Sequence, residues 1–264
     1  MRFIVCIKQV PDTTEVRVDP ETNTLIREGV PATVNPFDLY AVEEALLLKE
    51  KFGGEVIAIS MGPPQAEEAL REVISMGVDK AILISDRKFA GSDSWATSLT
   101  LAAAIRKIGS FDIIFTGKQA ADGDTAQVGP GIAEFLDIPQ ATFVRKVDEL
   151  NIENRIIRLQ SMWEEGSELL ELPLPCLITT VKELNEPRLP SLRGKLTAKK
   201  AEIPLWSFDE LAVEEKHVGL AGSPTQVIKV FPPPPRAEGE LFADADPDEA
   251  ARIIADKLTE KGLL

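Results

Sequence analysis

The sequence has few of the residues that build metal centres and disulfide frameworks. Its 264 residues include one histidine and two cysteines. The histidine, His217, lies in a charged run with no second histidine or close cysteine to complete a metal site. We therefore expect no metal site and a solvated surface histidine. Cys6 and Cys176 lie in separate apolar runs, which favours buried free thiols over a disulfide.

Basic residues are scarce, and long apolar runs are missing. The chain has 29 Lys and Arg against 43 Asp and Glu, a net charge of −14, so nucleic acid is not an expected partner. No apolar run approaches the roughly 18 residues that span a bilayer, so we expect no transmembrane segment. Residues 1–10 lack a signal-peptide pattern and are interpreted as a first strand, which makes the cytoplasm the expected compartment.

The common catalytic motifs are also missing. The sequence contains no G-x-S-x-G elbow, no Walker A loop and no G-x-G-x-x-G fingerprint. Gly117 and Gly123 have the wrong spacing for a Walker A loop, and Lys118 is in the wrong place. We therefore expect no catalytic side chain. Any chemistry would be carried by a bound cofactor, while the protein supplies binding and orientation.

Strand-like and helix-like segments alternate through the first half of the chain. Strands are expected at residues 3–10, 56–60, 81–85 and 113–116, and helices at about 36–52, 65–76, 94–108 and 125–136. Asn35 is expected to be the N-cap of the first helix, and a polar hairpin is expected at residues 16–26. Short apolar strands separated by helices indicate a parallel sheet covered on both faces. The sequence predicts a doubly wound α/β domain over residues 1–183.

The second half loses this regularity. Strands at 142–147, 156–160 and 176–181 are expected to extend the same sheet with an antiparallel hairpin. Residues 184–204 combine prolines and basic residues and are expected to form a long exposed loop, and residues 205–231 to continue the α/β domain. Residues 232–264 combine a proline spacer, Pro232 to Pro235, with an amphipathic helix at about 248–261. That helix is docked either on its own domain or on a partner.

The run Gly117 to Pro130 is the most informative loop. It follows the fourth expected strand, and ligands of open α/β sheets bind beyond the carboxyl ends of strands. We expect Asp124 to cap the next helix with Gln127 reciprocating, which leaves the amides of Thr125 and Ala126 free to meet a phosphate. Capping alone would explain Asp124 and Gln127, but the loop's length and glycines favour nucleotide binding. The loops 34–38 and 60–65 are expected at the same edge.

Five segments occur in the order found in one known family. They are Lys8-Gln9-Val10-Pro11-Asp12, Asn35-Pro36-Phe37, Met61-Gly62-Pro63, Gly117-Lys118-Gln119-Ala120 and Leu184-Asn185-Glu186-Pro187-Arg188. Together they resemble the beta subunit of the electron-transferring flavoproteins. The resemblance is clear from residue 2 to about residue 200 and looser to the C-terminus.

The resemblance implies a nucleotide pocket. Its residues would be Cys6, Asn35, Pro36, Phe37, Asp38, Met61, Gly117, Lys118, Gln119, Ala120, Ala121, Asp122, Gly123, Asp124, Thr125, Ala126, Gln127 and Val128. The family's pocket holds AMP in ordinary members and FAD in electron-bifurcating members. The run 122–130 is similar to the bifurcating pattern, because ordinary members carry a third acidic residue in place of Gly123. The resemblance therefore implies FAD, with AMP as the alternative.

The resemblance also implies partners. Hydride would pass from NADH to the FAD, then one electron to ferredoxin or flavodoxin and one, through the alpha-subunit flavin, to an acyl-CoA or similar dehydrogenase. Residues 184–204 resemble the dehydrogenase-recognition loop, with partner-binding residues Leu184, Asn185, Glu186, Pro187, Arg188 and Leu192. Leu192 would be an apolar anchor with Arg188, Arg193 and Lys195 as a charged rim, although a plain flexible loop has the same pattern. The C-terminal arm, 232–264, would embrace the alpha subunit.

Three hypotheses remain open. The chain is a bifurcating subunit with FAD and NADH sites, an ordinary subunit with a structural AMP, or a stand-alone nucleotide-binding regulator on a similar fold.

Overall fold

The computed structural model describes residues 1–12, 31–228, 239 and 246–264. The chain divides into two compact units, residues 1–230 and residues 231–264. The expected hairpin at 16–26 and the spacer Pro232 to Pro235 lie outside the described residues.

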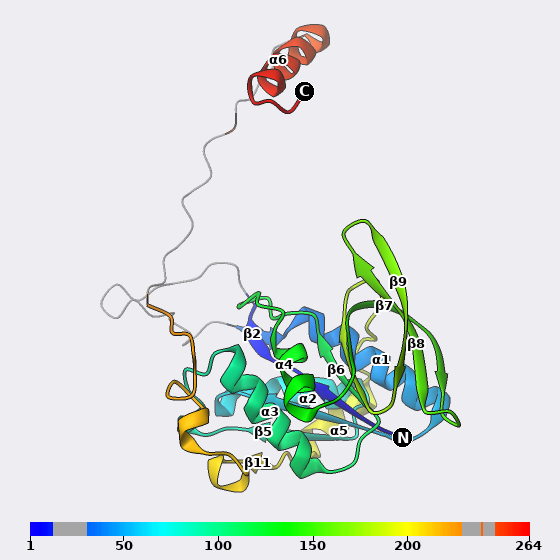
Figure 1. Cartoon of the computed structure of the whole chain (residues 1–264), viewed down its shortest axis with the longest axis vertical. Coiled ribbons are helices and arrows are strands. Elements are labelled where there is room, and N and C mark those ends of the chain that lie inside the picture. Colours follow the sequence, from blue (N-terminus) through cyan, green and yellow to red (C-terminus); the bar gives the residue numbers. More distant parts are fainter. Residues whose placement is uncertain (13–30, 229–238, 240–245) are drawn as a thin grey trace. The chain divides into compact units, whose positions relative to one another are not determined.

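The larger unit is built on a nine-stranded sheet with the strand order β11-β5-β4-β1-β6-β10-β7-β8-β9 (Figure 1). The strands are β1 (Arg2–Cys6), β4 (Glu55–Met61), β5 (Lys80–Ile84), β6 (Ile113–Gly117), β7 (Gln140–Asn151), β8 (Ile156–Trp163), β9 (Gly166–Pro173), β10 (Cys176–Thr180) and β11 (Leu205–Trp206). Neighbouring strands from β11 to β7 are all parallel. The two remaining pairs, β7 with β8 and β8 with β9, are antiparallel. This confirms the predicted mainly parallel sheet with an antiparallel extension.

The strands are apolar on both faces because helices cover both faces. In β1, Phe3 and Val5 belong to the core under α1 (Pro36–Phe52) and α2 (Glu67–Met76). Ile4 and Cys6 point the other way, into the core under α3 (Ser94–Ile108) and α4 (Val128–Leu136). The larger unit also contains α5 (Leu192–Lys200) and four short 3-10 helices, η1 (Pro64–Ala66), η2 (Arg87–Phe89), η3 (Phe208–Glu210) and η4 (Glu215–His217).

Three expectations from the sequence need correction. The strand expected at 3–10 is two strands, because β1 ends at Cys6 and β2 (Gln9–Pro11) pairs instead with β3 (Ala32–Val34). The fourth helix begins at Val128 rather than at residue 125, because Asp124 and Ala126 have φ of 47° and 55°, which no α-helix accepts. The exposed loop expected over 184–204 is wrong for residues 192–200, which form α5.

The smaller unit contains α6 (Pro247–Glu260), within one residue of the expected helix. The Asp246 carboxylate caps it by accepting hydrogen bonds from the amides of Asp248 and Glu249. Whether α6 lies on its own domain or on a partner stays a prediction.

The described residues include neither a membrane-spanning helix nor a cluster of metal ligands. None of the described helices is both long enough and apolar enough to cross a membrane. Within the same residues, no three His, Cys, Asp or Glu side chains gather in a way that could hold a metal ion.

Candidate functional site

The candidate site lies where the order of the sheet reverses. The chain passes from β1 to β4 and β5 on one side, then returns to β6 on the other side of β1. In open α/β sheets this reversal leaves a crevice at the carboxyl ends of the two strands. Cys6 ends β1 and Gly117 ends β6, so both lie at this edge, as does Met61 at the end of β4.

Asp38 joins three segments at the crevice. Its side chain lies in the first turn of α1 and is 5% exposed. One carboxylate oxygen accepts a hydrogen bond from the amide of Lys8 (2.7 Å), and the other accepts from Asn35 Nδ2 (2.9 Å) and the amide of Gly117 (3.1 Å). Burial raises the pKa of Asp38 to about 7, against the opposite effect of these hydrogen bonds. The start of α1 is therefore fixed to the ends of β1 and β6.

Asn35 extends this network to the loop after β6. It occupies the expected N-cap position of α1, but its side chain makes no capping hydrogen bond. Its Nδ2 donates to the Gln119 carbonyl oxygen (2.8 Å) as well as to Asp38, and its Oδ1 accepts from the amide of Ala121 (3.0 Å). The sequence placed Asn35 correctly and missed its role, which is to hold the loop against α1.

Two lysines lie at the mouth of the crevice. Lys8 Nζ forms an ion pair with Asp122 at 2.6 Å. Lys118 Nζ lies 5.2 Å from the centre of the Phe37 ring. Lys8 was not among the predicted site residues, and the signal that could have found it is its place directly after the end of β1. Lys118 has no ion-pair partner among the described residues and would favour an anionic ligand such as a phosphate, whereas the charge of Lys8 is already balanced by Asp122.

The loop reaches α4 differently from the prediction. The Asp124 carboxylate accepts a hydrogen bond from Gln119 Nε2 and does not cap α4, where Gln127 occupies the N-cap position without a side-chain bond. Thr125 Oγ1 lies 3.3 Å from the Ser94 hydroxyl. The amides of Thr125 and Ala126 therefore precede the helix, and they donate to none of the described residues. These two amides remain available to an anion. They belong to the loop and not, as expected, to the first turn of the helix.

Three glycines show where the site is tight and where it is open. A Cβ on Gly117 would overlap Asp38 Oδ1, and a Cβ on Gly129 would lie 2.7 Å from Thr179 Cγ2. At Gly123 the nearest atom to such a Cβ is Lys8 Nζ, at 4.0 Å. The loop is therefore closely packed at both ends and open at Gly123. The two free amides and the ammonium group of Lys118 fit a ligand that carries a phosphate.

The two cysteines are buried free thiols, as predicted. Burial, together with the nearby charge of Asp38, raises the pKa of Cys6 far above its ordinary value. Burial raises the pKa of Cys176 to about 12. Because the thiolate is the nucleophile, neither side chain is set up for nucleophilic chemistry.

The predicted partner-binding residues belong to the segment 184–201, here called the docking segment, which begins beside the middle of α1. Leu184 packs on the core, and Asn185 Nδ2 donates to the Tyr40 carbonyl oxygen (3.0 Å) and to Glu44 Oε2 (3.1 Å). Arg188 Nη2 lies 2.9 Å from Glu43 Oε1, and its Nη1 lies 2.5 Å from Glu50 Oε1. The guanidinium of Arg188 is partly exposed and held on α1, and its place in a charged rim around Leu192 stays a prediction. Leu192 is exposed, as predicted.

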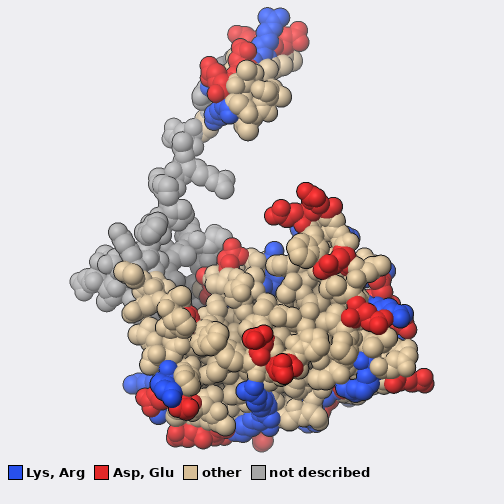
Figure 2. All heavy atoms as spheres, in the orientation of Figure 1, with Lys and Arg blue, Asp and Glu red and all other residues tan. Residues whose placement is uncertain are grey.

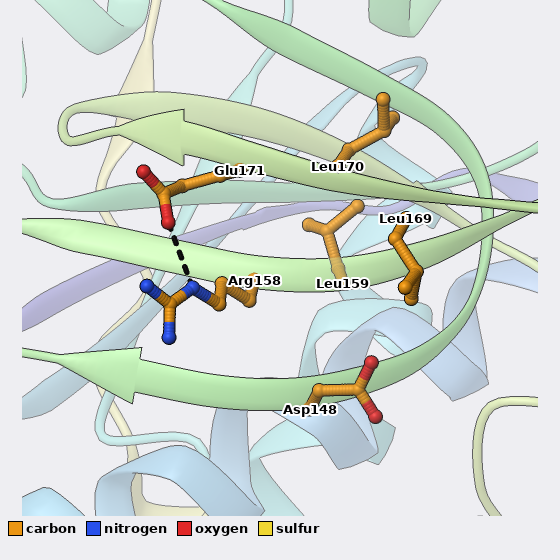
Figure 3. A pocket seen from close by; sticks show the side chains of 6 residues that line it. All are labelled: Asp148, Arg158, Leu159, Leu169, Leu170 and Glu171. Carbon is orange, nitrogen blue, oxygen red and sulfur yellow. Dashed lines mark hydrogen bonds and ion pairs between the residues drawn. The ribbon is translucent and has the colours of Figure 1, made fainter.

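A surface hollow of about 320 Å³ lies away from both regions, on the antiparallel extension (Figure 3). It is lined by Asp148, Arg158, Leu159, Leu169, Leu170 and Glu171. Arg158 forms an ion pair with Glu171 at 2.7 Å across the strands. None of the predicted site residues lines this hollow.

The fold and the crevice define a doubly wound α/β protein with a closely packed loop at the reversal of its sheet. Comparison with known proteins gives the family: residues 22–211 match the model of the electron transfer flavoprotein domain. The chain belongs to the electron transfer flavoprotein family.

Two relatives of similar length are named as subunits, and a third is named FixA. The chain is 47% identical, over all of both chains, to the caffeyl-CoA reductase-Etf complex subunit CarD of Acetobacterium woodii. It is 48% identical to the electron transfer flavoprotein subunit beta of Clostridium acetobutylicum, over 99% of each chain. It is 49% identical to the protein FixA of Azotobacter vinelandii, over 98% of this chain and 94% of that one. The resemblance to beta subunits of this family is thus confirmed.

Proposed function

We propose that the chain is the beta subunit of a heterodimeric electron-transferring flavoprotein and holds FAD in the crevice between β1 and β6. The observation that carries this proposal is the network of Asp38 and Asn35, which gathers the ends of both strands and the loop after β6 into one site. The family and the relative in a reductase-Etf complex support a role in an oxidoreductase complex. The compartment we propose is the cytoplasm.

Each part of the site has a role in this proposal. Lys118 and the amides of Thr125 and Ala126 would hold the phosphates, and Lys8 would join them when its ion pair with Asp122 opens. Asn35 keeps the loop in place, and Gly123 leaves room for a ligand larger than AMP. The bound FAD supplies hydride and single-electron chemistry, and the chain supplies binding, orientation and a dry environment.

The electron path follows the family resemblance. NADH is the donor, and electrons leave to ferredoxin or flavodoxin and, through an alpha-subunit flavin, to an acyl-CoA or similar dehydrogenase. The dehydrogenase docks at the region 184–204, and residues 232–264 lie on the alpha subunit. No side chain of this chain acts as acid or base in this path.

The second candidate is an ordinary beta subunit with a structural AMP. The ion pair between Lys8 and Asp122 favours this second candidate. The ion pair draws the loop toward β1 and narrows the opening at Gly123.

The test is the cofactor content of the heterodimer, co-expressed with its alpha subunit. Extraction is expected to give two FAD per heterodimer, and NADH is expected to bleach the flavin absorbance without any other protein. One FAD and one AMP, with no bleaching by NADH, would replace the first candidate by the second.

A further inference from the structure

Asp93, at the start of α3, ties that helix to the segment 219–225, here called the strap. Its Oδ1 caps α3 by accepting hydrogen bonds from the amides of Trp95 (3.0 Å) and Ala96 (3.1 Å). Its Oδ2 accepts from the amide (2.9 Å) and the hydroxyl (2.7 Å) of Thr225. Burial of Asp93 opposes its charge, yet these hydrogen bonds keep the pKa of its carboxyl below the ordinary value. One carboxylate therefore serves two segments.

The strap makes further bonds to the turn that leads into α3. The Ser223 hydroxyl accepts a hydrogen bond from the amide of Asp93 (2.8 Å) and donates to the carbonyl oxygen of Gly219 (2.7 Å). The amide of Leu220 donates to the carbonyl oxygen of Ala90 (3.0 Å). The strap and the start of α3 are therefore bonded to each other at several points.

The start of α3 also contacts the loop after β6, residues 118–127. The hydroxyl of Ser94 lies 3.3 Å from Thr125 Oγ1. One turn later, the hydroxyl of Ser98 lies 3.1 Å from the carbonyl oxygen of Val128, where α4 begins. A Cβ on Gly131 would overlap this hydroxyl, so α3 and α4 are in close contact here. A shift at the start of α3 would therefore be felt by the loop.

The loop needs such support because its backbone is strained beside Thr125. Asp124 and Ala126 have φ of 47° and 55°, the left-handed conformation. Residues with a Cβ adopt it at a cost in free energy and keep it only where their surroundings hold it. Thr125 lies between the two, so Ser94 contacts the loop at the strained point.

The position of the loop decides how well it can hold an anion. The chain has a net charge of −14, and on the face drawn in Figure 2 acidic and basic side chains lie in small separate groups. A broad positive surface therefore does not collect anions on this face, and binding depends on individual donors. The amides of Thr125 and Ala126 donate to none of the described residues, and donors held in place before binding raise affinity.

We propose that Asp93 is a positioning residue of the nucleotide site, which fixes the start of α3 so that Ser94 holds Thr125 and the two free amides stay in place for the ligand. The strap is thereby coupled to the nucleotide. Loosening the strap weakens nucleotide binding, and nucleotide binding tightens the strap by the same free energy. The proposal rests on the proposed function in one respect, which is that the ligand of the crevice carries a phosphate.

The test compares Asp93→Asn with Asp86→Asn in the heterodimer. Asparagine still caps a helix, but it places an NH2 group where Asp93 accepts from the amide of Thr225. Asp86 is a matched control, because it caps η2 through Lys88 (2.9 Å) and accepts from the distant amide of Phe208 (3.0 Å). Neither bond of Asp86 leads to α3 or to the loop after β6.

The first measurement is amide hydrogen exchange in the heterodimer freed of nucleotide. Asp93→Asn is expected to speed exchange both in the strap and at the bonded amides of the loop, those of Ala121, Gly123 and Asp124, whereas Asp86→Asn changes neither. Unchanged exchange of the loop in Asp93→Asn would overturn the positioning role, whatever the ligand is.

The second measurement is the Kd of the same heterodimer for FAD and for AMP. Asp93→Asn is expected to raise the Kd about tenfold and Asp86→Asn less than about twofold. A purely structural role of Asp93 would lower the free energy of unfolding in both variants and leave the Kd unchanged. An equal Kd in the two variants would therefore overturn the proposal.

The route through Ser94 is tested by substituting its hydroxyl. Ser94→Ala is expected to raise the Kd, and Ser94→Thr, which keeps a hydroxyl, is expected to retain the unmodified value. The double variant Asp93→Asn, Ser94→Ala should bind no more weakly than the weaker single variant, because both act on one contact. Fully additive effects would overturn this route.

Failure of the coupling and failure of the proposed function give different results. Binding of AMP without FAD would contradict FAD as the ligand, and the ratios of Kd for AMP would then decide the role of Asp93. If the unmodified heterodimer binds neither nucleotide, the proposed function is contradicted, while the exchange experiment still decides whether Asp93 sets the loop.

Discussion

Two of the three buried carboxylates of α1, Asp38 and Glu43, have different kinds of partner. Asp38, 5% exposed, accepts hydrogen bonds from two backbone amides and the Asn35 amide group. Glu43, 4% exposed, accepts from the guanidinium and the amide of Arg188. Burial raises the pKa of Asp38 to about 7, whereas Glu43 raises the pKa of Arg188 above its ordinary value. Asp38 is thus held by uncharged donors, whereas Glu43 is held by the charged guanidinium of Arg188.

The largest effect is expected at Asp38. Asp38→Ala leaves three donors without an acceptor in the core of the crevice, and the expected loss is roughly 3 to 5 kcal/mol in the free energy of unfolding. Urea unfolding of the heterodimer measures it, with Asp209→Ala, an exposed acid, as the control. A loss below about 1 kcal/mol would show that the network does not stabilise the fold.

The raised pKa of Asp38 makes the stability of the crevice depend on pH. The folded-state pKa of Asp38, about 7, lies above the value in the unfolded chain, so its stabilising contribution is complete at low pH and is lost as the pH rises through about 7. The expected loss between pH 5 and pH 8 is roughly 2 to 3 kcal/mol. The free energy of unfolding is measured in urea across this pH range for the unmodified protein and for Asp38→Asn. The difference between the two isolates the contribution of the Asp38 titration. A constant difference between the two proteins would contradict it.

A smaller effect is expected at the docking segment. Glu43→Gln keeps the shape of the side chain and removes the charge opposite Arg188, which is partly exposed, so a loss of about 1 to 3 kcal/mol is expected. Glu50→Gln is the matched control. Glu50 also pairs with Arg188 but is exposed, so less than about 1 kcal/mol is expected. Equal losses of unfolding free energy in the two variants would mean that the buried ion pair of Glu43 stabilises the fold no more than the exposed ion pair of Glu50.

The smallest effect on stability is expected at Gly123, where the loop is open. Gly123→Asp should change the free energy of unfolding by about 0.5 kcal/mol or less and still lower the retention of FAD, because a carboxylate enters the space beside Lys8. Flavin content after gel filtration measures this, and Gly166→Asp is the control. Unchanged flavin content would contradict the assignment of this space to the ligand.

The sequence predicted the sheet and its helices well, for a physical reason. Buried parallel strands are short continuous apolar runs, and their helices carry local start and stop signals, so the predicted bounds of α3 agree with the structure. The start of α4 was missed because Asp124 and Gln127 form a plausible capping pair in sequence. A longer-range bond from Gln119 removes Asp124 from that role.

The docking segment was harder to predict because its order comes from distant residues. The end of α5 is held by Arg71 of α2. Arg188 is held by Glu43, which lies 145 positions away in the sequence. Prolines and basic residues alone are typical of a loop. In the site, Asn35 and Asp38 were found by resemblance, but their bonds to Gly117 and Ala121 appear only when the sheet brings β1 and β6 together.

The first turn of α1 belongs to the proposed nucleotide site, while residues 40–50 of the same helix hold the start of the docking segment. Asn35→Ala and Asn185→Ala separate these two roles, because both remove an amide that ties α1 to another segment. The measurement is the nucleotide extracted from each purified heterodimer. Asn35→Ala is expected to lose the nucleotide, and Asn185→Ala is expected to keep it. Equal retention in the two variants would show that the crevice network does not hold the nucleotide.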